Sequence, residues 1–223
     1  MGWPGTGRRR ERSDQPLGGY KLAHPMVSAD GTKVGFSGVT VGRGHVYRTV
    51  DDAICVQGGT HSCPSRWCDC GFYCFHDIGA ARDLACDPEH RDAVLLHVAA
   101  SGRYRRYERG VRYARQRVRS VQLGRCGCGR PATGFADSGS GSVGWRRLVQ
   151  SCPLCVGTRP RIDIATFGRL AGPGVTVACE PGVAVPERAD TPGLVAVLSA
   201  EMALLQARLD EMQSRLEELT RGG

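Results

Sequence analysis

Cys126-Gly127-Cys128-Gly129, followed by Cys152-Pro153-Leu154-Cys155, is the stretch of sequence that decides how this part of the chain is held together. Two Cys pairs on tight turns, separated by a segment long enough for a short hairpin, have the spacing of a four-thiolate zinc site. In such a site each sulfur lies about 2.3 Å from a tetrahedral metal ion. The spacing therefore predicts a β zinc ribbon over residues 124–165, with all four cysteines as ligands.

A second cluster of cysteines and histidines lies upstream, between Cys55 and His76. Cys68-Asp69-Cys70-Gly71 is a compact knuckle like the later one, and Cys55 and His61 complete a shell of three thiolates and one imidazole. Cys63 is the alternative to His61 as the fourth ligand. We therefore expect two Zn²⁺ ions per chain. The alternative for each cluster is a set of inert thiols, because free Cys packs as a small apolar residue.

The eleven cysteines also suit a disulfide framework, but that framework requires an oxidising compartment. Residues 1–20 contain four arginines and no apolar stretch of the length that a signal peptide or membrane anchor needs. Lysine occurs only at Lys21 and Lys33, beside 28 arginines and no asparagine, which indicates a GC-rich bacterial genome. We expect a reduced, cytoplasmic protein without membrane contact.

The formal charge of +8 is concentrated in an arginine-rich segment, residues 103–119, in which tyrosines alternate with the arginines. Arginines can bind phosphates and tyrosines can stack on bases, so this pattern predicts contact with nucleic acid. The alternative is a solvated sheet face. The candidate contact residues are Arg103, Tyr104, Arg105, Arg106, Tyr107, Arg109, Arg112, Arg115 and Arg117, with Arg119 and Tyr113 beside them.

Composition divides the chain into five parts and predicts an α+β fold. Residues 1–20 are expected to form a flexible basic tail and residues 21–123 a small zinc-stabilised α+β domain that holds the first site. After the ribbon, residues 166–190 have little periodicity and are interpreted as a linker with one short strand at residues 175–177. Residues 191–221 are expected to form a coiled-coil helix, which predicts a homo-oligomer or a helical partner protein. Its a and d positions are Val195, Leu198, Met202, Leu205, Leu209, Met212, Leu216 and Leu219.

Within the first domain, local patterns predict short strands and one helix. Residues 35–41, 46–50, 94–99 and 118–123 are candidate strands, and residues 78–86 form a candidate helix that ends near Pro88. Ser101-Gly102 is predicted to be a hairpin turn that sends residues 103–107 back antiparallel. In the ribbon, strands are expected at residues 132–136 and 145–150.

Residues 46–118 resemble a group of uncharacterised bacterial zinc-binding domains. In that group a Cys and a His precede a Cys-x-Cys-Gly-apolar-Tyr motif, and a helix and a strand pair lead to a Gly-Arg…Tyr-Glu-Arg-Gly segment. The resemblance implies zinc binding through the first motif but no activity. Ala usually follows the Tyr in the group, where this chain has Cys74, so Cys74 is not expected to be a ligand. The matching residues are Cys55, His61, Cys68, Cys70, Gly71, Phe72, Tyr73, Gly102, Arg103, Tyr107, Glu108, Arg109 and Gly110.

The motifs favour a protein that acts by binding. The deaminase pair of His-x-Glu and Pro-Cys-x-x-Cys is absent, as are a phosphate-binding Gly-Lys-Ser/Thr loop and a Gly-x-Ser-x-Gly elbow. Cys74, His76 and Asp77 are adjacent in sequence, but catalytic triads assemble in space. We predict a non-enzymatic zinc-binding protein, a regulatory or accessory factor that contacts nucleic acid. The alternatives are a protein–protein adaptor without nucleic-acid contact and a zinc- or thiol-dependent enzyme.

Overall fold

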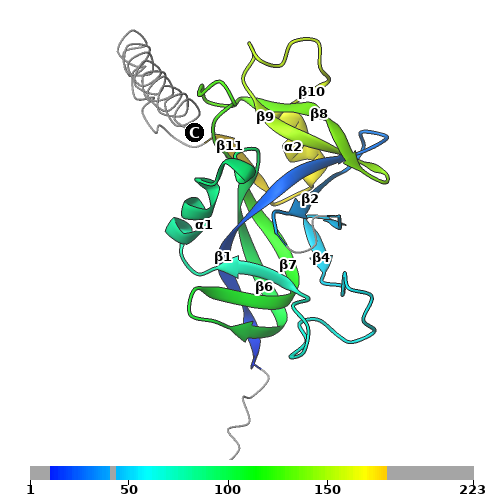
Figure 1. Ribbon diagram of the computed structural model, residues 1–223, viewed down its shortest axis with the longest axis vertical. Helices are drawn as coiled ribbons and strands as arrows, with labels where there is room; N and C mark the ends of the chain where they lie inside the picture. The colour runs from blue at the N-terminus through cyan, green and yellow to red at the C-terminus, as the bar shows by residue number, and fades with distance from the viewer. Residues whose placement is uncertain (1–10, 41–43, 180–223) are drawn as a thin grey trace, which may run out of the picture. The chain divides into compact units, whose positions relative to one another are not determined.

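The fold is organised by one eleven-stranded sheet, shown in Figure 1, in the computed structural model, which describes residues 11–40 and 44–179. Two α-helices and one 3-10 helix accompany the strands in these residues. In chain order the elements are β1 (Glu11–Ser28), β2 (Val34–Gly38), β3 (Val46–Tyr47), β4 (Val50–Asp52), β5 (Phe72–Phe75), α1 (Ile78–Ala85), the 3-10 helix (Pro88–His90), β6 (Val94–Arg106), β7 (Gly110–Leu123), β8 (Gly134–Ser142), β9 (Trp145–Ser151), β10 (Arg161–Asp163), α2 (Ile164–Ala171) and β11 (Thr176–Cys179).

Two long strands, β1 and β7, hold the sheet together. β1 pairs with β6 along much of its length and then, through Met26–Ser28, with β9, so it joins the two halves of the sheet (Figure 1). β7 pairs with β6 on one side and with β4, β5 and β11 on the other. The β11 pairing is parallel, and within the described residues the other strand pairings of the sheet are antiparallel.

The core follows the two-residue period of these strands. In β6 the side chains of Val94, Leu96, Val98 and Ala100 are buried at alternate positions, as expected for a strand with one face against the core. α2 places Phe167 against Phe36 and Phe135, with ring centroids 6.3 and 4.4 Å apart. Burial of each large apolar side chain stabilises the fold by about 1.5–3 kcal/mol.

Both helices begin at an aspartate that satisfies free backbone N–H groups. Asp77 accepts hydrogen bonds from Gly79 N and Ala80 N at the start of α1. Asp163 accepts one from Thr166 N at 2.7 Å at the start of α2. Such caps contribute about 1 kcal/mol each. The predicted helix over residues 78–86 is confirmed by α1.

The α+β prediction is wrong, because most of the regular secondary structure in the described residues is strand, beside two α-helices of eight residues each. Residues 11–20, assigned to a flexible tail, lie in β1, where pairing with β6 supplies backbone partners that the polar sequence does not reveal. Residues 124–165 do not form a separate ribbon, because β9 pairs with β1 in the common sheet. The predicted linker contains most of α2, and the short strand expected at residues 175–177 overlaps β11. Residues 11–179 thus fall within one structural unit.

The predicted hairpin turn at Ser101-Gly102 is also wrong. β6 continues through it to Arg106, and the register with β7 shifts between Ser101 and Tyr104, which marks a β-bulge rather than a turn. The chain reverses instead at residues 107–109, where Tyr107 N donates to Gly110 O at 2.8 Å. The arginine-rich segment is therefore spread along two paired strands and their connecting turn.

The predicted coiled-coil helix, residues 191–221, lies outside the described residues. Within the described residues, neither helix is long and apolar enough to cross a bilayer.

Candidate metal centres

The first cysteine–histidine cluster lies on a long loop, residues 53–71, which we call the metal loop. β4 and β5 both pair with β7, so Asp52 lies opposite Arg115 and Phe72 lies opposite Tyr113. The metal loop thus leaves and rejoins β7 at positions only two residues apart. A loop of this length with such close ends forms few backbone hydrogen bonds of its own. Coordination of a metal ion would supply the missing stabilisation.

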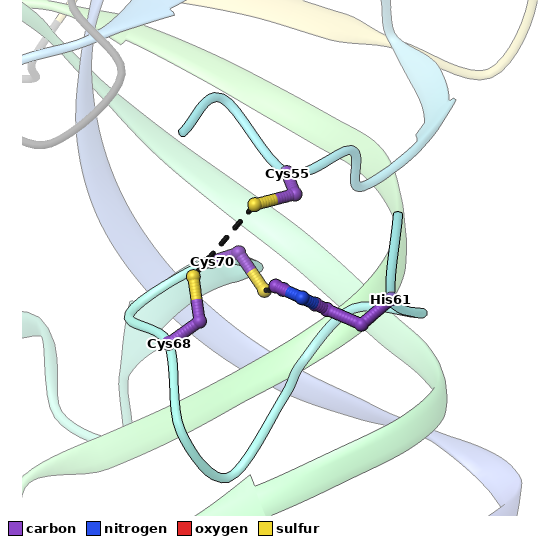
Figure 2. A group of neighbouring side chains, drawn as sticks. All are labelled: Cys55, His61, Cys68 and Cys70. Atoms are coloured by element: carbon purple, nitrogen blue, oxygen red, sulfur yellow. Dashed lines mark hydrogen bonds between the residues drawn. The ribbon is translucent and has the colours of Figure 1, made fainter. Parts of the chain in front are cut away.

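Four side chains of the metal loop converge on one point: Cys55, His61, Cys68 and Cys70, shown in Figure 2. Their ligand atoms all lie within 4.8 Å of one another. Cys55 Sγ and Cys68 Sγ are 3.7 Å apart, and His61 Nε2 is 3.2 Å from Cys70 Sγ. Sulfurs about 2.3 Å from a tetrahedral ion lie about 3.8 Å from each other, whereas disulfide sulfurs lie about 2.0 Å apart. The cluster therefore fits a four-coordinate metal ion and not a disulfide.

Local backbone geometry brings these ligands together. Gly71, which ends the Cys-x-Cys-Gly knuckle, has a φ of +116°, a value that side chains with a Cβ rarely adopt. At Gly59 a Cβ would lie 2.7 Å from His61 Nδ1, so a larger residue there would require the imidazole to shift. Partial desolvation acts against ionisation of Cys55, but hydrogen bonds from the backbone N–H groups of Gln57 and Gly59 lower its pKa.

Two arginines of the arginine-rich segment hold the metal loop in place. The buried guanidinium of Arg112 donates to Cys68 O at 2.8 Å and to Ser65 O at 2.9 Å, and it also contacts Asp69 at 3.4 Å. Arg103 donates to Cys63 O at 3.3 Å. The sequence analysis assigned both arginines to phosphate contact and missed this role, since nothing in the sequence shows that β6 and β7 bring Arg103 and Arg112 to the metal loop.

Cys63, the alternative fourth ligand, is buried beside the cluster but is not one of the four converging residues. Cys63 instead influences the pKa of Cys70. Burial is the larger cause that raises this pKa, and a hydrogen bond with the Cys63 thiol raises it further. The geometry therefore groups His61 with the three thiols.

The second cluster lies where β7 and β9 end. Cys126 and Cys128 follow β7, and Cys152 and Cys155 follow β9. The buried side chain of Gln150 ties this region together, because its carbonyl accepts from Gly124 N and its amide donates to Ala93 O at 2.8 Å.

The four sulfurs of the second cluster also lie within 4.8 Å of one another, and Cys128 Sγ is 3.7 Å from Cys152 Sγ. Tight turns present them: Gly129 N donates to Cys126 O at 2.8 Å, and Cys155 N donates to Cys152 O at 3.2 Å. As in the first knuckle, the glycine after the second Cys, Gly129, has a positive φ of 84°. All four residues that the sequence analysis selected are thus brought together.

Electrostatics in the second cluster suit a cation. A hydrogen bond from the backbone N–H of Arg130 lowers the pKa of Cys128 to about 6. Interaction with the Cys128 sulfur raises the pKa of Cys155 to about 12, because neighbouring thiols cannot all ionise without a compensating charge. A divalent metal would supply that charge and release the remaining protons.

The arginine-rich segment does not form one continuous surface. Arg103 and Arg112 contact the metal loop, and Tyr104 and Tyr113 pack in the core. Two groups remain available. The turn group (Arg105, Arg106 and Arg109) lies at the β6–β7 reversal, and the strand group (Arg115, Arg117 and Arg119) occupies alternate, exposed positions of β7.

The strand group borders a groove of about 300 Å³, together with Pro16, Val50 and Ala99. Arg115 forms an ion pair with Asp52 at 3.0 Å. In the part of the chain that the structure describes, no acidic side chain forms an ion pair with Arg117 or Arg119.

Comparisons of this chain with protein-family models, with curated proteins and with solved structures find no match.

Proposed function

We propose that this chain is a non-enzymatic zinc-binding protein that holds two structural Zn²⁺ ions. The observation that carries the proposal is the convergence of two complete four-ligand sets, each with its ligand atoms within 4.8 Å. Thiolate-rich sets with at most one imidazole select zinc over magnesium or calcium, which prefer oxygen ligands. A shell with four protein ligands leaves no position for a substrate, so it supports a structural rather than a catalytic role.

Each ion would replace contacts that the sheet does not provide. The first ion would join the two halves of the metal loop beside β7. The second ion would link the segment after β7 to the segment after β9. Because both shells require thiolates, the proposal includes a reducing compartment such as the cytoplasm. It also includes kinship with the bacterial zinc-domain group, whose two motifs lie close together here: the ring centroids of Tyr73 and Tyr107 are 6.5 Å apart.

Zinc analysis of the purified protein tests this proposal. We expect about two Zn²⁺ per chain. Replacement of Cys68 and Cys70 by Ser, or of Cys152 and Cys155 by Ser, should remove one ion and leave the other. The matched control is Cys86→Ser, because Cys86 is exposed and lies outside both clusters. A ratio below one in the wild type, or loss of both ions in either double variant, would contradict two independent sites.

A second candidate function is contact with nucleic acid through the strand group. The observation that favours it is the regular exposure of Arg115, Arg117 and Arg119 on one face of β7 beside a groove. Such a face suits phosphates and carries no base-reading element, so binding would be insensitive to sequence.

Fluorescence anisotropy with labelled single-stranded and duplex DNA over a range of salt concentrations tests this second function. The variant Arg115→Ala/Arg117→Ala/Arg119→Ala should weaken binding and reduce the salt slope by about 2 on single strands or about 3 on duplex. The matched control changes the turn group to alanine in the same way. Absence of wild-type binding would leave the protein–protein adaptor as the remaining binding role.

A further inference from the structure

A cavity of about 780 Å³ lies between the metal loop and strands β1, β2 and β5. Its walls are mainly apolar and include Leu22, Val39, Ile54 and Phe75. This volume is in the range of sites that bind small organic molecules, which combine apolar walls with a few placed polar groups. Three buried side chains with polar groups, Lys21, Tyr47 and Arg112, also line the cavity, as do the exposed Asp69, Glu108 and Arg109.

Lys21 is a cation without a counter-charge. Its side chain is buried, and its Nζ donates to the Gln116 carbonyl at 3.4 Å. The ammonium lies over the rings of Tyr47 and Phe72, at 4.6 and 5.1 Å from their centroids. No carboxylate among residues 11–40 and 44–179 forms an ion pair with it. An ammonium in such a place costs free energy unless an anion accompanies it.

The neighbouring thiol of Cys74 does not supply that anion. Burial raises the pKa of Cys74 to about 11, so the thiol is neutral near pH 7. Burial also lowers the pKa of Lys21 to about 8, which still leaves most of the amine protonated at neutral pH. The positive charge therefore remains uncompensated within the described protein.

The groups packed around Lys21 are neutral. The Tyr47 hydroxyl is buried and hydrogen-bonds to the side chain of Gln116, whose carbonyl also accepts from Lys21 Nζ. The ammonium therefore lies at the wall of a mainly apolar cavity without an anion beside it, an arrangement that a carboxylate with an apolar body would satisfy.

We propose that this cavity binds a small apolar carboxylate, with its anionic group at Lys21 Nζ and its apolar body against Phe72, Ile54 and Val39. The cavity borders Cys70 and Gly71 of the metal loop, so the loop would form part of the wall. The site goes beyond the structural role of the metal centres, and it does not depend on which metal they hold.

The test uses the full-length protein as purified, with 1-pyrenebutyric acid as the probe. The methyl ester of this acid is the control ligand, because it has the same apolar body without the charge. Pyrene fluorescence gives both affinities. A charge-assisted hydrogen bond in a buried site is stronger than a neutral one, so we expect the acid to bind at least about tenfold more tightly than the ester.

The chain offers a matched pair of variants, because Lys21 and Lys33 are its two lysines and Lys33 is exposed. Lys21→Met should abolish the preference for the acid, and Lys33→Met should preserve it. Equal affinities for acid and ester in the wild type would overturn the proposal, as would a preference that survives in Lys21→Met.

A second measurement decides the question if Lys21→Met does not fold. Wild-type protein labelled with ¹³C at lysine Cε gives two side-chain signals. Addition of the acid should shift the Lys21 signal, and the ester should leave it in place. A shift confined to Lys33, or the same Lys21 shift with both ligands, would overturn the proposal.

Discussion

Replacement of Arg112 by Ala should lower the zinc affinity of the first metal centre although all four ligand side chains are retained. Arg112 fixes the loop at Cys68 and three residues before it, through Cys68 O and Ser65 O. Its guanidinium is buried, so water does not replace these bonds easily. The variant leaves two carbonyl oxygens without their charged donor, and the knuckle loses its anchor on β7.

The magnitude follows from the contacts. A hydrogen bond to a charged group contributes about 1.5–3 kcal/mol, so the two carbonyl contacts give an upper bound of about 3–6 kcal/mol. The pair with Asp69 adds little, because that carboxylate is 87% exposed. Water entry recovers part of the loss, which leaves about 3 kcal/mol. If the whole of this free-energy loss appears in zinc binding, the affinity for zinc falls roughly 100-fold.

Competition with the chromophoric chelator 4-(2-pyridylazo)resorcinol measures that affinity. The assay is cleanest in the Cys152→Ser/Cys155→Ser background, which is expected to hold only the first ion. Arg117→Ala is the matched control, because Arg117 lies on the same strand and is exposed. Arg112→Lys should give an intermediate affinity, since one ammonium cannot span both carbonyls as the guanidinium does.

The reasoning is refuted if Arg112→Ala binds zinc as tightly as its parent, or if Arg117→Ala weakens binding as much. Either result would mean that the ligands position themselves without support from β7.

Three further predictions use other features of the structure. First, His61→Ala should reduce zinc content from two to about one per chain whereas Cys63→Ser should leave it at two, because only His61 belongs to the converging set; equal losses would show that Cys63 is needed too. Second, Gly110→Ala should destabilise the fold by more than about 2 kcal/mol in urea unfolding, because its Cβ would overlap Cys74 O and lie 2.6 Å from the Tyr73 hydroxyl; Gly127→Ala, with open space, is the control that should have little effect. Third, the pKa of Lys21 is lowered from 10.5 to about 8, so between these pH values the unfolded chain holds more protons than the folded chain, and stability should rise with pH. The gain is on the order of 3 kcal/mol and should vanish in Lys21→Met; parallel pH profiles for the two proteins would contradict it.

The candidate ligands were accessible from the sequence because metal coordination depends on short spacing. Cys-x-Cys-Gly places two sulfurs on one tight turn whatever the surrounding fold, and the residue that follows must tolerate a positive φ, as Gly71 and Gly129 do. Helix α1 was predictable for a similar reason, since its cap at Asp77 and its apolar spacing are local. These features are determined within a few residues of chain.

The sheet and the roles of the arginines were decided only by tertiary structure, because strand pairing joins residues that are distant in sequence. Nothing local marks residues 11–20 as a strand; they become one because β6 offers backbone partners. Arg112 and Arg117 look alike in sequence, but the pleat of β7 turns one under the metal loop and leaves the other exposed. The buried charge of Lys21 is likewise a product of the fold, since its burial depends on Tyr47, Phe72 and Gln116, which three different segments bring to it.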